Sequence, residues 1–350
     1  MIAAVLEELG KFAVKPVPTP VPDDDSILVK VRACAVCGSD LRIYRSGNSR
    51  VKMPQILGHE MAGEVVQVGK NVTKFSVGDK VAIGADVPCG KCAACEAGIG
   101  NNCQTNYAMG YQYAGGFAEY VLLNRMVVDF GPVHKIPDDA VFAEYALAEP
   151  LGCVLNALER SPIHIGDTVV VIGCGPIGCM MMPVMKKMGA ARIIGVERSP
   201  LRQTVALENG ADVIVDPNEG DIVEAVLALT NNEGADVVFT ATPVPEMQEC
   251  AIRMAKNRAR INFFGGLPAN NSKVSLDTNI IHYKELAISG AHGSLPRHHG
   301  QAVELIRSGV INVKPFVTNH YPLEEIESAF EAATARQCMR VVVEPWGEQK

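Results

Sequence analysis

The sequence predicts an α/β protein built from a mostly β domain and a doubly wound domain with a parallel sheet. Up to about residue 150, short β-rich runs alternate with Pro and Gly clusters. From about residue 152, near-continuous apolar runs alternate with helical stretches, which is typical of a parallel sheet covered on both faces. The chain has 350 residues, 48% of them apolar, so it can bury a core of ordinary size in each of two domains.

We expect three segments, namely residues 1–151, 152–289 and 290–350. The β-rich runs of the first segment are 27–31, 63–68, 80–83 and 119–123. The strands expected in the second segment are 168–172, 192–196, 212–215, 236–240, 260–264 and 285–289. The third segment contains two helix-like runs and a strand, which are 300–308, 323–334 and 339–343. We expect it to fold back onto the first segment.

The composition favours small-molecule chemistry. The formal net charge is −7 and no dense Lys/Arg run occurs, which argues against nucleic-acid and anionic-membrane partners. The chain starts without a basic region before an apolar stretch, and no apolar run reaches about 18 residues. We therefore expect a cytoplasmic protein.

Four of the eleven cysteines lie within fifteen residues, at Cys89, Cys92, Cys95 and Cys103. The spacing of two residues lets tight turns present successive sulfurs to one Zn²⁺, in a lobe of about residues 86–106. With all four ligand positions filled, such a site is closed and structural. A reducible cysteine cluster or an iron–sulfur centre is the alternative. The remaining cysteines, apart from Cys37, are expected to be small buried hydrophobic residues; they are Cys34, Cys153, Cys174, Cys179, Cys250 and Cys338.

A second candidate metal site combines Cys37, His59 and Glu60, with Glu149 as a possible fourth member. A thiolate, an imidazole and a carboxylate give zinc three ligands and leave one position open, as in a catalytic site. Asp40 is expected either to support this site or to form an ordinary turn in the loop.

A glycine-rich loop follows the apolar run 168–172 and opens a helical stretch, so its amides can approach a pyrophosphate. Glu197, at the end of the next strand, favours NAD over NADP because a carboxylate there accepts ribose hydroxyls and repels a 2′-phosphate. Arg198 weakens this preference, since an arginine can receive the phosphate. Pro183 is expected to kink the helix after the loop. The loop residues are Gly173, Gly175, Pro176, Ile177 and Gly178.

These motifs occur in an order that resembles the zinc-containing medium-chain dehydrogenases/reductases, and the resemblance covers essentially the whole chain. Further segments that carry it are Cys-Gly-Ser-Asp at 37–40, Gly-Gly-Phe-Ala-Glu-Tyr at 115–120 and Ala-Glu-Pro-Leu-Gly at 148–152. The chain is similar to the polyol branch, which contains the sorbitol (L-iditol) dehydrogenases. This implies a GroES-like catalytic domain, a Rossmann nucleotide-binding domain and a homodimer or homotetramer.

The resemblance also implies roles for single residues. It makes Cys37, His59 and Glu60 ligands of one catalytic zinc, with Glu149 binding the metal or its water. It makes Ser39 the hydroxyl that takes the substrate proton. The residues that it places along the dinucleotide are Ile177, Glu197, Arg202, Phe264, Gly265 and Gly266. Arg42 stands where the family often has a proton-relay histidine, which weakens the threonine-dehydrogenase alternative in particular.

The expected reaction is reversible oxidation of a secondary alcohol in a polyol, sugar or sugar-derived substrate, with hydride transfer to NAD. We expect the active site in the cleft between the domains. Arg42, Arg297 and the histidines at 292, 298 and 299 can select the far end of a substrate, although surface solvation accounts for at least half of them. The alternatives are a dehydrogenase of threonine or short diols, a zinc-independent quinone or enone reductase, and a non-catalytic zinc-braced protein.

Overall fold

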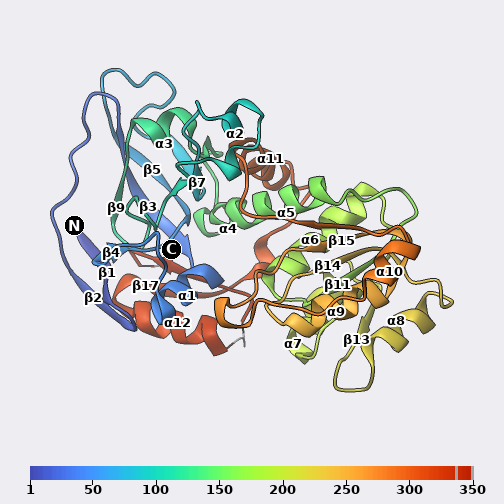
Figure 1. Cartoon of the computed structure of the whole chain (residues 1–350). Helices are drawn as coiled ribbons and strands as arrows, with labels where there is room; N and C mark the ends of the chain where they lie inside the picture. Colours follow the sequence, from blue (N-terminus) through green and yellow to red (C-terminus); the bar gives the residue numbers. More distant parts are fainter. Residues whose placement is uncertain (336–337, 348–350) are drawn as a thin grey trace. The chain divides into compact units, whose positions relative to one another are not determined.

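The computed structural model describes residues 1–335 and 338–347 and divides the chain into two compact units. Unit 1 comprises Met1–Cys153 and Gly293–Lys350, and unit 2 comprises Val154–His292. Figure 1 shows the elements of both units along the chain, and each unit is described by itself. Among the described residues, no helix has both the length and the apolar composition needed to cross a membrane.

Unit 1 is built on a seven-stranded sheet with the order β10-β6-β5-β3-β18-β17, in which β9 also pairs with β3. The two longest strands, β3 and β5, are antiparallel and bring Ala35 opposite Glu60. Both extend further than the sequence patterns predict. The strands are β3 (Ile27–Ala35), β5 (Glu60–Val68), β6 (Lys80–Ile83), β9 (Tyr120–Leu123), β10 (Val133–Lys135), β17 (Val317–Pro322) and β18 (Arg340–Glu344).

Two small sheets and several short helices complete the N-terminal part of unit 1. The first sheet has the order β2-β1-β4 and the second joins β7 to β8. These strands are β1 (Ile2–Glu8), β2 (Lys11–Pro16), β4 (Gln55–Ile56), β7 (Asp86–Val87) and β8 (Tyr107–Ala108). The helices are α1 (Gly38–Ser46), α2 (Ala93–Glu96), η1 (Gly100–Asn102), α3 (Arg125–Phe130), α4 (Phe142–Ala146) and α5 (Ala148–Arg160), of which α5 continues into unit 2.

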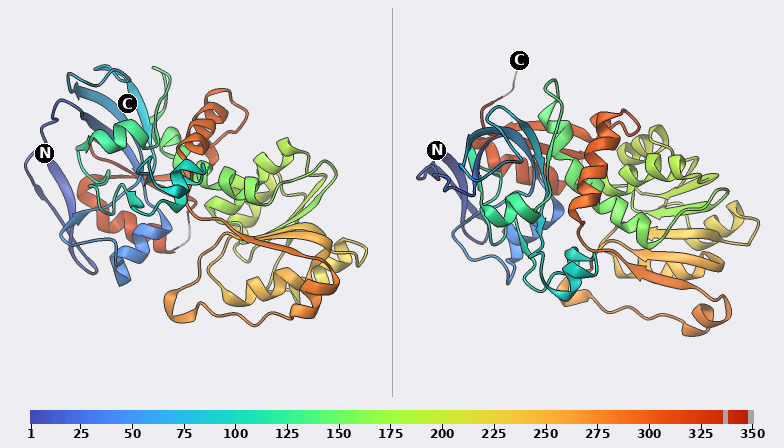
Figure 2. Two further views of the ribbon diagram at one scale, coloured as in Figure 1. Left: turned by 45° about the horizontal axis from the view of Figure 1, so that its top comes forward. Right: turned by 90° about the horizontal axis from the view of Figure 1, so that it is seen from above.

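The C-terminal segment adds two strands to the main sheet of unit 1. Strand β18 lies antiparallel to β3, with Val342 opposite Ala35, and parallel to β17. Both views in Figure 2 show this red segment beside the blue N-terminal strands. The remaining helices of the segment are α11 (Pro296–Arg307), η3 (Lys314–Phe316), η4 (Leu323–Glu325) and α12 (Ile326–Ala335). Phe330 of α12 packs edge-on against Phe12 and Phe117, which fixes the segment to the core.

Unit 2 contains a six-stranded parallel sheet with the order β13-β12-β11-β14-β15-β16, so the predicted doubly wound fold is confirmed. The order reverses at β11, the position where such sheets bind ligands at the carboxyl ends of their strands. The strands are β11 (Thr168–Ile172), β12 (Arg192–Val196), β13 (Val213–Val215), β14 (Ala235–Thr240), β15 (Ala255–Phe263) and β16 (Ala287–Gly290). The helices are α6 (Pro176–Met188), α7 (Pro200–Glu208), α8 (Ile222–Leu229), α9 (Pro245–Arg253), η2 (Ala269–Asn271) and α10 (Thr278–Tyr283). Helix α6 continues through Pro183.

Candidate metal centres and dinucleotide site

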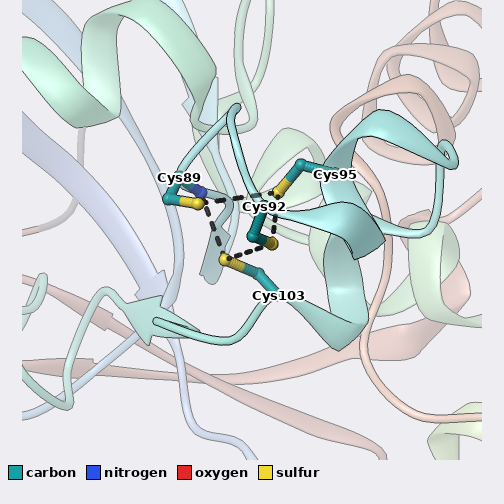
Figure 3. Close-up of side chains that lie close together, drawn as sticks. All are labelled: Cys89, Cys92, Cys95 and Cys103. Carbon is teal, nitrogen blue, oxygen red and sulfur yellow. Dashed lines mark hydrogen bonds between the residues drawn. The ribbon is translucent and has the colours of Figure 1, made fainter.

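The four clustered cysteines of unit 1 converge on one point (Figure 3). The sulfur atom of Cys92 lies 3.5 Å from the sulfur of Cys95 and 3.8 Å from that of Cys103. The sulfur atoms of Cys89 and Cys95 are 4.0 Å apart. All are free thiols. A tetrahedron with Zn–S bonds of about 2.3 Å has edges of about 3.8 Å. The observed separations bracket that value, so the quartet fits a tetrahedral zinc ion with no open position.

The local backbone explains this convergence. Gly90 and Gly98 adopt φ angles of +74° and +75°, which glycine tolerates best. The backbone N–H of Cys89 donates to the sulfur of Cys103 over 3.3 Å. Backbone N–H groups of Gln104 and Cys95 lower the pKa of Cys92 to about 6, so this thiol readily supplies a thiolate.

The second candidate set gathers Cys37, His59 and Glu60, whose ligand atoms all lie within 4.8 Å of one another. Cys37 is the residue before α1, and His59 directly precedes Glu60 at the start of β5. Gly58 has a φ of +95°, and a Cβ there would lie 2.6 Å from the sulfur of Cys34. Only glycine fits at this position, and it provides the sharp backbone turn directly before the ligand pair.

Asp40 connects two members of this set. Its Oδ2 accepts the backbone N–H of Cys37 over 3.0 Å. Its Oδ1 lies 3.3 Å from Nδ1 of His59, close enough for an ion pair but without hydrogen-bond alignment. Burial lowers the pKa of His59, but Asp40 and Cys37 together outweigh burial and leave the pKa well above its usual value. Asp40 therefore supports the imidazole of His59 and the backbone of Cys37.

Arg340 of β18 is the buried counter-ion of Glu60. Its Nη2 lies 2.9 Å from Oε1 of Glu60, and its Nη1 donates to the carbonyl of Val36 over 3.1 Å. Burial raises the pKa of Glu60 to about 7, although Arg340 lowers it. The arginine thus fixes the carboxylate beside Cys37 and His59. It compensates only part of the free-energy cost of burying that charge.

Unpaired polar atoms test whether this set suits a cation. Oε2 of Glu60 is buried without a hydrogen bond, whereas Oε1 of Glu60 already lies against Arg340 and Nδ1 of His59 against Asp40. Such atoms are rare in folded proteins and call for a missing partner. One thiol, one imidazole and one carboxylate are ligand types of zinc, and three of them leave a coordination position open. The set therefore fits a catalytic zinc ion.

Glu149, at the start of α5, is buried near this set but lies outside the group whose ligand atoms are mutually within 4.8 Å. Burial raises its pKa to about 7, with His59 lowering it and Cys37 raising it. Its Oε1 accepts from the thiol of Cys153 over 3.6 Å. Six cysteines were expected to be buried, and Cys153 is only half-buried. The other five are buried, namely Cys34, Cys174, Cys179, Cys250 and Cys338.

Ser39 lies beside the imidazole of the candidate ligand set. Its Oγ is 3.3 Å from Nε2 of His59. Tyr111 is the second neighbour: burial raises its pKa, and a hydrogen bond with Ser39 opposes that shift. The guanidinium of Arg50 lies over the Tyr111 ring, 4.9 Å from its centroid. The serine hydroxyl therefore lies between an imidazole and a phenol.

The five residues considered for substrate selection fall into two groups. Arg42, Arg297 and His292 have exposed side chains. His298 and His299 are buried in α11. Nδ1 of His298 accepts the backbone N–H of Leu295, and Nδ1 of His299 lies 2.9 Å from Nδ1 of His134. These two histidines hold α11 in place through their contacts, so they are not solvated surface residues.

The glycine-rich loop of unit 2 follows β11 as the sequence predicts. A Cβ on Gly178 would lie 2.0 Å from the carbonyl oxygen of Gly173, and one on Gly265 would lie 2.5 Å from that of Thr242. Gly173 has a φ of +94°. A Cβ on Gly175 would have open space except for Arg202, 3.7 Å away. Pro176 and Ile177 open α6, and Phe264 with Gly266 flanks Gly265 after β15.

Glu197 follows β12 and is tied to this loop. Its Oε2 accepts the backbone N–H of Cys174 over 3.0 Å. Its Oε1 accepts the backbone N–H groups of Arg198 and Ser199, each over 3.0 Å. The carboxylate therefore holds the loop and the turn after β12 together.

Comparisons with known proteins agree with this geometry. Residues 23–138 match the alcohol dehydrogenase GroES-like domain and residues 176–308 match the zinc-binding dehydrogenase domain. The chain belongs to the zinc-binding alcohol dehydrogenase family. This family member is 36% identical over 333 residues to an L-threonine 3-dehydrogenase of Bacillus licheniformis, covering 94% of each chain. It is 34% identical to a sorbitol dehydrogenase of Bacillus subtilis, over 99% of this chain and 97% of the relative.

The fold comparison points to the same family. A zinc-binding dehydrogenase of Sinorhizobium meliloti 1021, solved with NADP, superposes with a TM-score of 0.92 at 32% identity. The match covers 98% of this dehydrogenase and 99% of the other chain. The expected GroES-like and Rossmann folds are thereby confirmed.

Sequence reasoning missed two residues of the dehydrogenase site, Arg340 and Tyr111. Arg340 is the first residue of a strand that continues with three valines, and a charge next to such an apolar run is a usable signal of a buried ion pair. Tyr111 lies in a loop with no periodic pattern, so nothing in the sequence indicated its contact with Ser39.

Proposed function

We propose that this dehydrogenase reversibly oxidises a secondary alcohol of a polyol, sugar or sugar-derived substrate to a ketone, with a nicotinamide dinucleotide as hydride acceptor. One zinc ion would occupy the Cys37, His59 and Glu60 set and a second the four-cysteine site. The carboxylate of Glu197 supports NAD as an acceptor. The NADP in the Sinorhizobium meliloti relative supports this cofactor class without selecting NAD or NADP. The family resemblance supports a homodimer or homotetramer.

The observation that carries the proposal is the open three-ligand set beside a serine hydroxyl. A closed quartet could only brace the fold. The three ligand residues, with a buried carboxylate oxygen of Glu60 that has no hydrogen bond, lie next to Ser39 and give a place where an alcohol oxygen can bind and lose its proton. A zinc ion bound there would act as a Lewis acid that lowers the pKa of the alcohol.

The chain's own residues supply orientation and proton transfer. Asp40 and Arg340 hold His59 and Glu60 in position. Ser39 Oγ accepts the substrate proton and lies within reach of His59 Nε2 and the Tyr111 hydroxyl. We propose that Glu149 contacts the oxygen atom that occupies the open coordination position. Its carboxylate is buried next to the ligand set but is not part of it.

A second candidate substrate is L-threonine, because the Bacillus licheniformis relative carries the name L-threonine 3-dehydrogenase. Arg42 argues against it: a relay histidine is expected at this position in such enzymes, and the arginine side chain is exposed on α1.

A panel of alcohols tests the substrate class. The purified zinc-loaded enzyme is assayed with NAD⁺ and NADP⁺ against sugar alcohols, phosphorylated polyols, threonine and short diols. We expect the highest kcat/KM with a polyol or sugar alcohol. A kcat/KM for threonine at least tenfold above that of every polyol would replace the proposal with the second candidate.

Replacement of Ser39 by Ala tests the proton acceptor. We expect kcat to fall by about 10²- to 10⁴-fold, the usual contribution of a positioned proton-transfer group, while KM for the alcohol changes little. The matched control is Ser46→Ala, since Ser46 is exposed at the other end of α1. A kcat within threefold of wild type in Ser39→Ala would remove Ser39 from the mechanism.

A further inference from the structure

A short basic segment follows Ser39 in unit 1. Its four basic residues are Arg42, Arg45, Arg50 and Lys52. Residues 41–57 contain no Asp or Glu, although the whole chain has a formal net charge of −7. A group of cations without acidic neighbours creates a positive potential that attracts anions. The segment therefore favours a negatively charged ligand near the candidate catalytic set.

Most of this positive charge is not neutralised by the protein. Arg42, Arg50 and Lys52 form no ion pair with a carboxylate among residues 1–335 and 338–347. Elsewhere in unit 1, the ammonium group of Lys135 lies 2.7 Å from a carboxylate oxygen of Asp79. The basic segment thus keeps charge that an anion can use.

Arg50 connects this segment to the candidate catalytic set. Its guanidinium carbon lies 4.9 Å from the centroid of the Tyr111 ring. That ring lies 5.9 Å from the imidazole ring of His59, and the Tyr111 hydroxyl forms a hydrogen bond with Ser39. One aromatic ring therefore separates Arg50 from the hydroxyl group that we assign to proton transfer.

The protein holds Arg50 in place and leaves hydrogen-bond donors over. Oδ1 of Asn48 accepts the backbone N–H of Arg50 over 2.9 Å, and Nη2 of Arg50 donates to the carbonyl of Asn106. The side chain is half-buried, and its Nε is buried without a hydrogen-bond partner. A guanidinium carries several N–H donors in a planar fork, which binds phosphate and carboxylate groups through charge-assisted hydrogen bonds.

The same charges discriminate between kinds of anionic substrate. An amino acid such as threonine has an ammonium group next to its carboxylate. Residues 41–57 offer no acidic side chain to that ammonium, and the cations of the segment repel it. A polyol or sugar derivative with only negative charge fits this surface better.

We propose that the substrate of this dehydrogenase is an anionic polyol or sugar derivative, whose phosphate or carboxylate group binds Arg50 while its reacting hydroxyl group lies beside Ser39. The inference rests on the proposed function, because it names the substrate class of the same site. The carbinol carbon gives a hydride to the dinucleotide and its oxygen gives a proton to Ser39. The anionic group is unchanged in the reaction, so Arg50 determines specificity only.

Steady-state kinetics of the full-length zinc-loaded enzyme with matched substrates tests this inference. Each set contains a neutral polyol, its terminal phosphate ester and the corresponding aldonate, and the polyols are glucitol, mannitol, galactitol and xylitol. We expect kcat/KM for one phosphate ester or aldonate to exceed that of every neutral polyol by at least tenfold. The better of the two anions shows whether the site takes a phosphate or a carboxylate.

Replacement of Arg50 by Gln identifies the residue that binds the anion. The KM for the preferred anion should rise about 10- to 100-fold, the usual effect of losing a charge-assisted hydrogen bond, while kcat stays within threefold. The KM for neutral polyols should also stay within threefold. Arg50→Lys should recover part of the loss, because it restores the charge.

Arg45→Gln is the matched control for Arg50→Gln. It removes one exposed cation of the same segment, whose guanidinium donates to Thr334. It should leave every KM unchanged, so it separates direct contact from the general charge of the segment. Bound zinc and thermal unfolding are measured for each variant, because Arg50 also bonds to the carbonyl of Asn106.

The outcomes separate this inference from the proposed function. Oxidation of neutral polyols with no tenfold preference for an anion would overturn the inference and leave the proposed function intact. A rise in KM below tenfold in folded, zinc-loaded Arg50→Gln would overturn it as well. If none of the polyols, esters or aldonates is oxidised, the proposed function fails together with the inference.

Discussion

Buried charges at the candidate catalytic set are the residues on which its geometry most depends. Glu60 is fully buried and Arg340 is its counter-ion at 2.9 Å. The two residues belong to adjacent segments of one sheet, because β18 and β5 both pair with β3. Removing one partner of such a pair leaves the other charge buried alone, which costs more than the pair itself contributes.

Arg340→Ala should lower the free energy of unfolding of the metal-free protein by about 3–5 kcal/mol, the usual cost of an uncompensated buried charge. Urea unfolding monitored by circular dichroism measures this. Arg307→Ala is the matched control, since its ion pair with Glu304 is exposed and its loss should leave stability close to wild type. A change below about 1 kcal/mol in Arg340→Ala would show that Glu60 needs no counter-ion.

Residue-scale prediction from the sequence worked where chemistry and spacing coincide. The four cysteines and the Gly58, His59, Glu60 motif carry their ligand types and their backbone requirements in a few consecutive residues. The Glu60–Arg340 pair joins positions 280 residues apart, and only the strand order places them together. The sequence also suggested a free carboxylate at Glu197, but the three backbone donors that engage it depend on the loop conformation.

At the scale of elements, a histidine pair joins α11 to β10. Nδ1 of His134 lies 2.9 Å from Nδ1 of His299, and Nε2 of His299 is buried without a hydrogen bond. Burial lowers the pKa of His134. Burial and the neighbouring His134 lower that of His299 well below its usual value. The folded protein therefore keeps both rings neutral.

This pair should make unit 1 sensitive to acid. Well above pH 6.5 both histidines are neutral in the folded and the unfolded state and add no pH dependence. As the pH falls below 6.5, the unfolded chain binds protons that the folded pair refuses, so stability falls by up to about 1.4 kcal/mol per pH unit for each histidine. We expect His299→Asn to reduce this slope between pH 6.5 and 5.5.

Urea unfolding at a series of pH values measures that slope, and the slope rather than the absolute stability is compared. The control is His282→Asn, because His282 is exposed on α10. Equal slopes in wild type and His299→Asn would show that the pair is protonated in the folded state.

Elements with a strong pattern were predicted, and elements that depend on distant partners were not. The apolar runs of unit 2 all became strands, within a few residues of the expected ends except at β15. That strand begins at Ala255, where the register shifts beside β14. Strands β1 and β2 escaped prediction, because β1 ends in Glu7 and Glu8 and is stabilised by pairing with β2 and β4. Helix α11 also begins earlier than expected. It starts at Pro296, and proline suits the first turn of a helix.

At the scale of the whole molecule, the two candidate metal sites divide their tasks within unit 1. The four-cysteine site is closed and fits a bracing role, and the Cys37, His59 and Glu60 set leaves a position for substrate. This division predicts that the two metals can be lost separately, with different consequences.

The most direct test measures bound zinc and turnover together in Cys37→Ser. Wild type should contain two zinc ions per chain. The variant should contain one, stay folded and lose kcat/KM by at least about 10³-fold, because a hydroxyl is a poor substitute for a zinc-bound thiolate. Two zinc ions in the variant, or turnover within tenfold of wild type, would contradict the claim that Cys37 belongs to the open catalytic site.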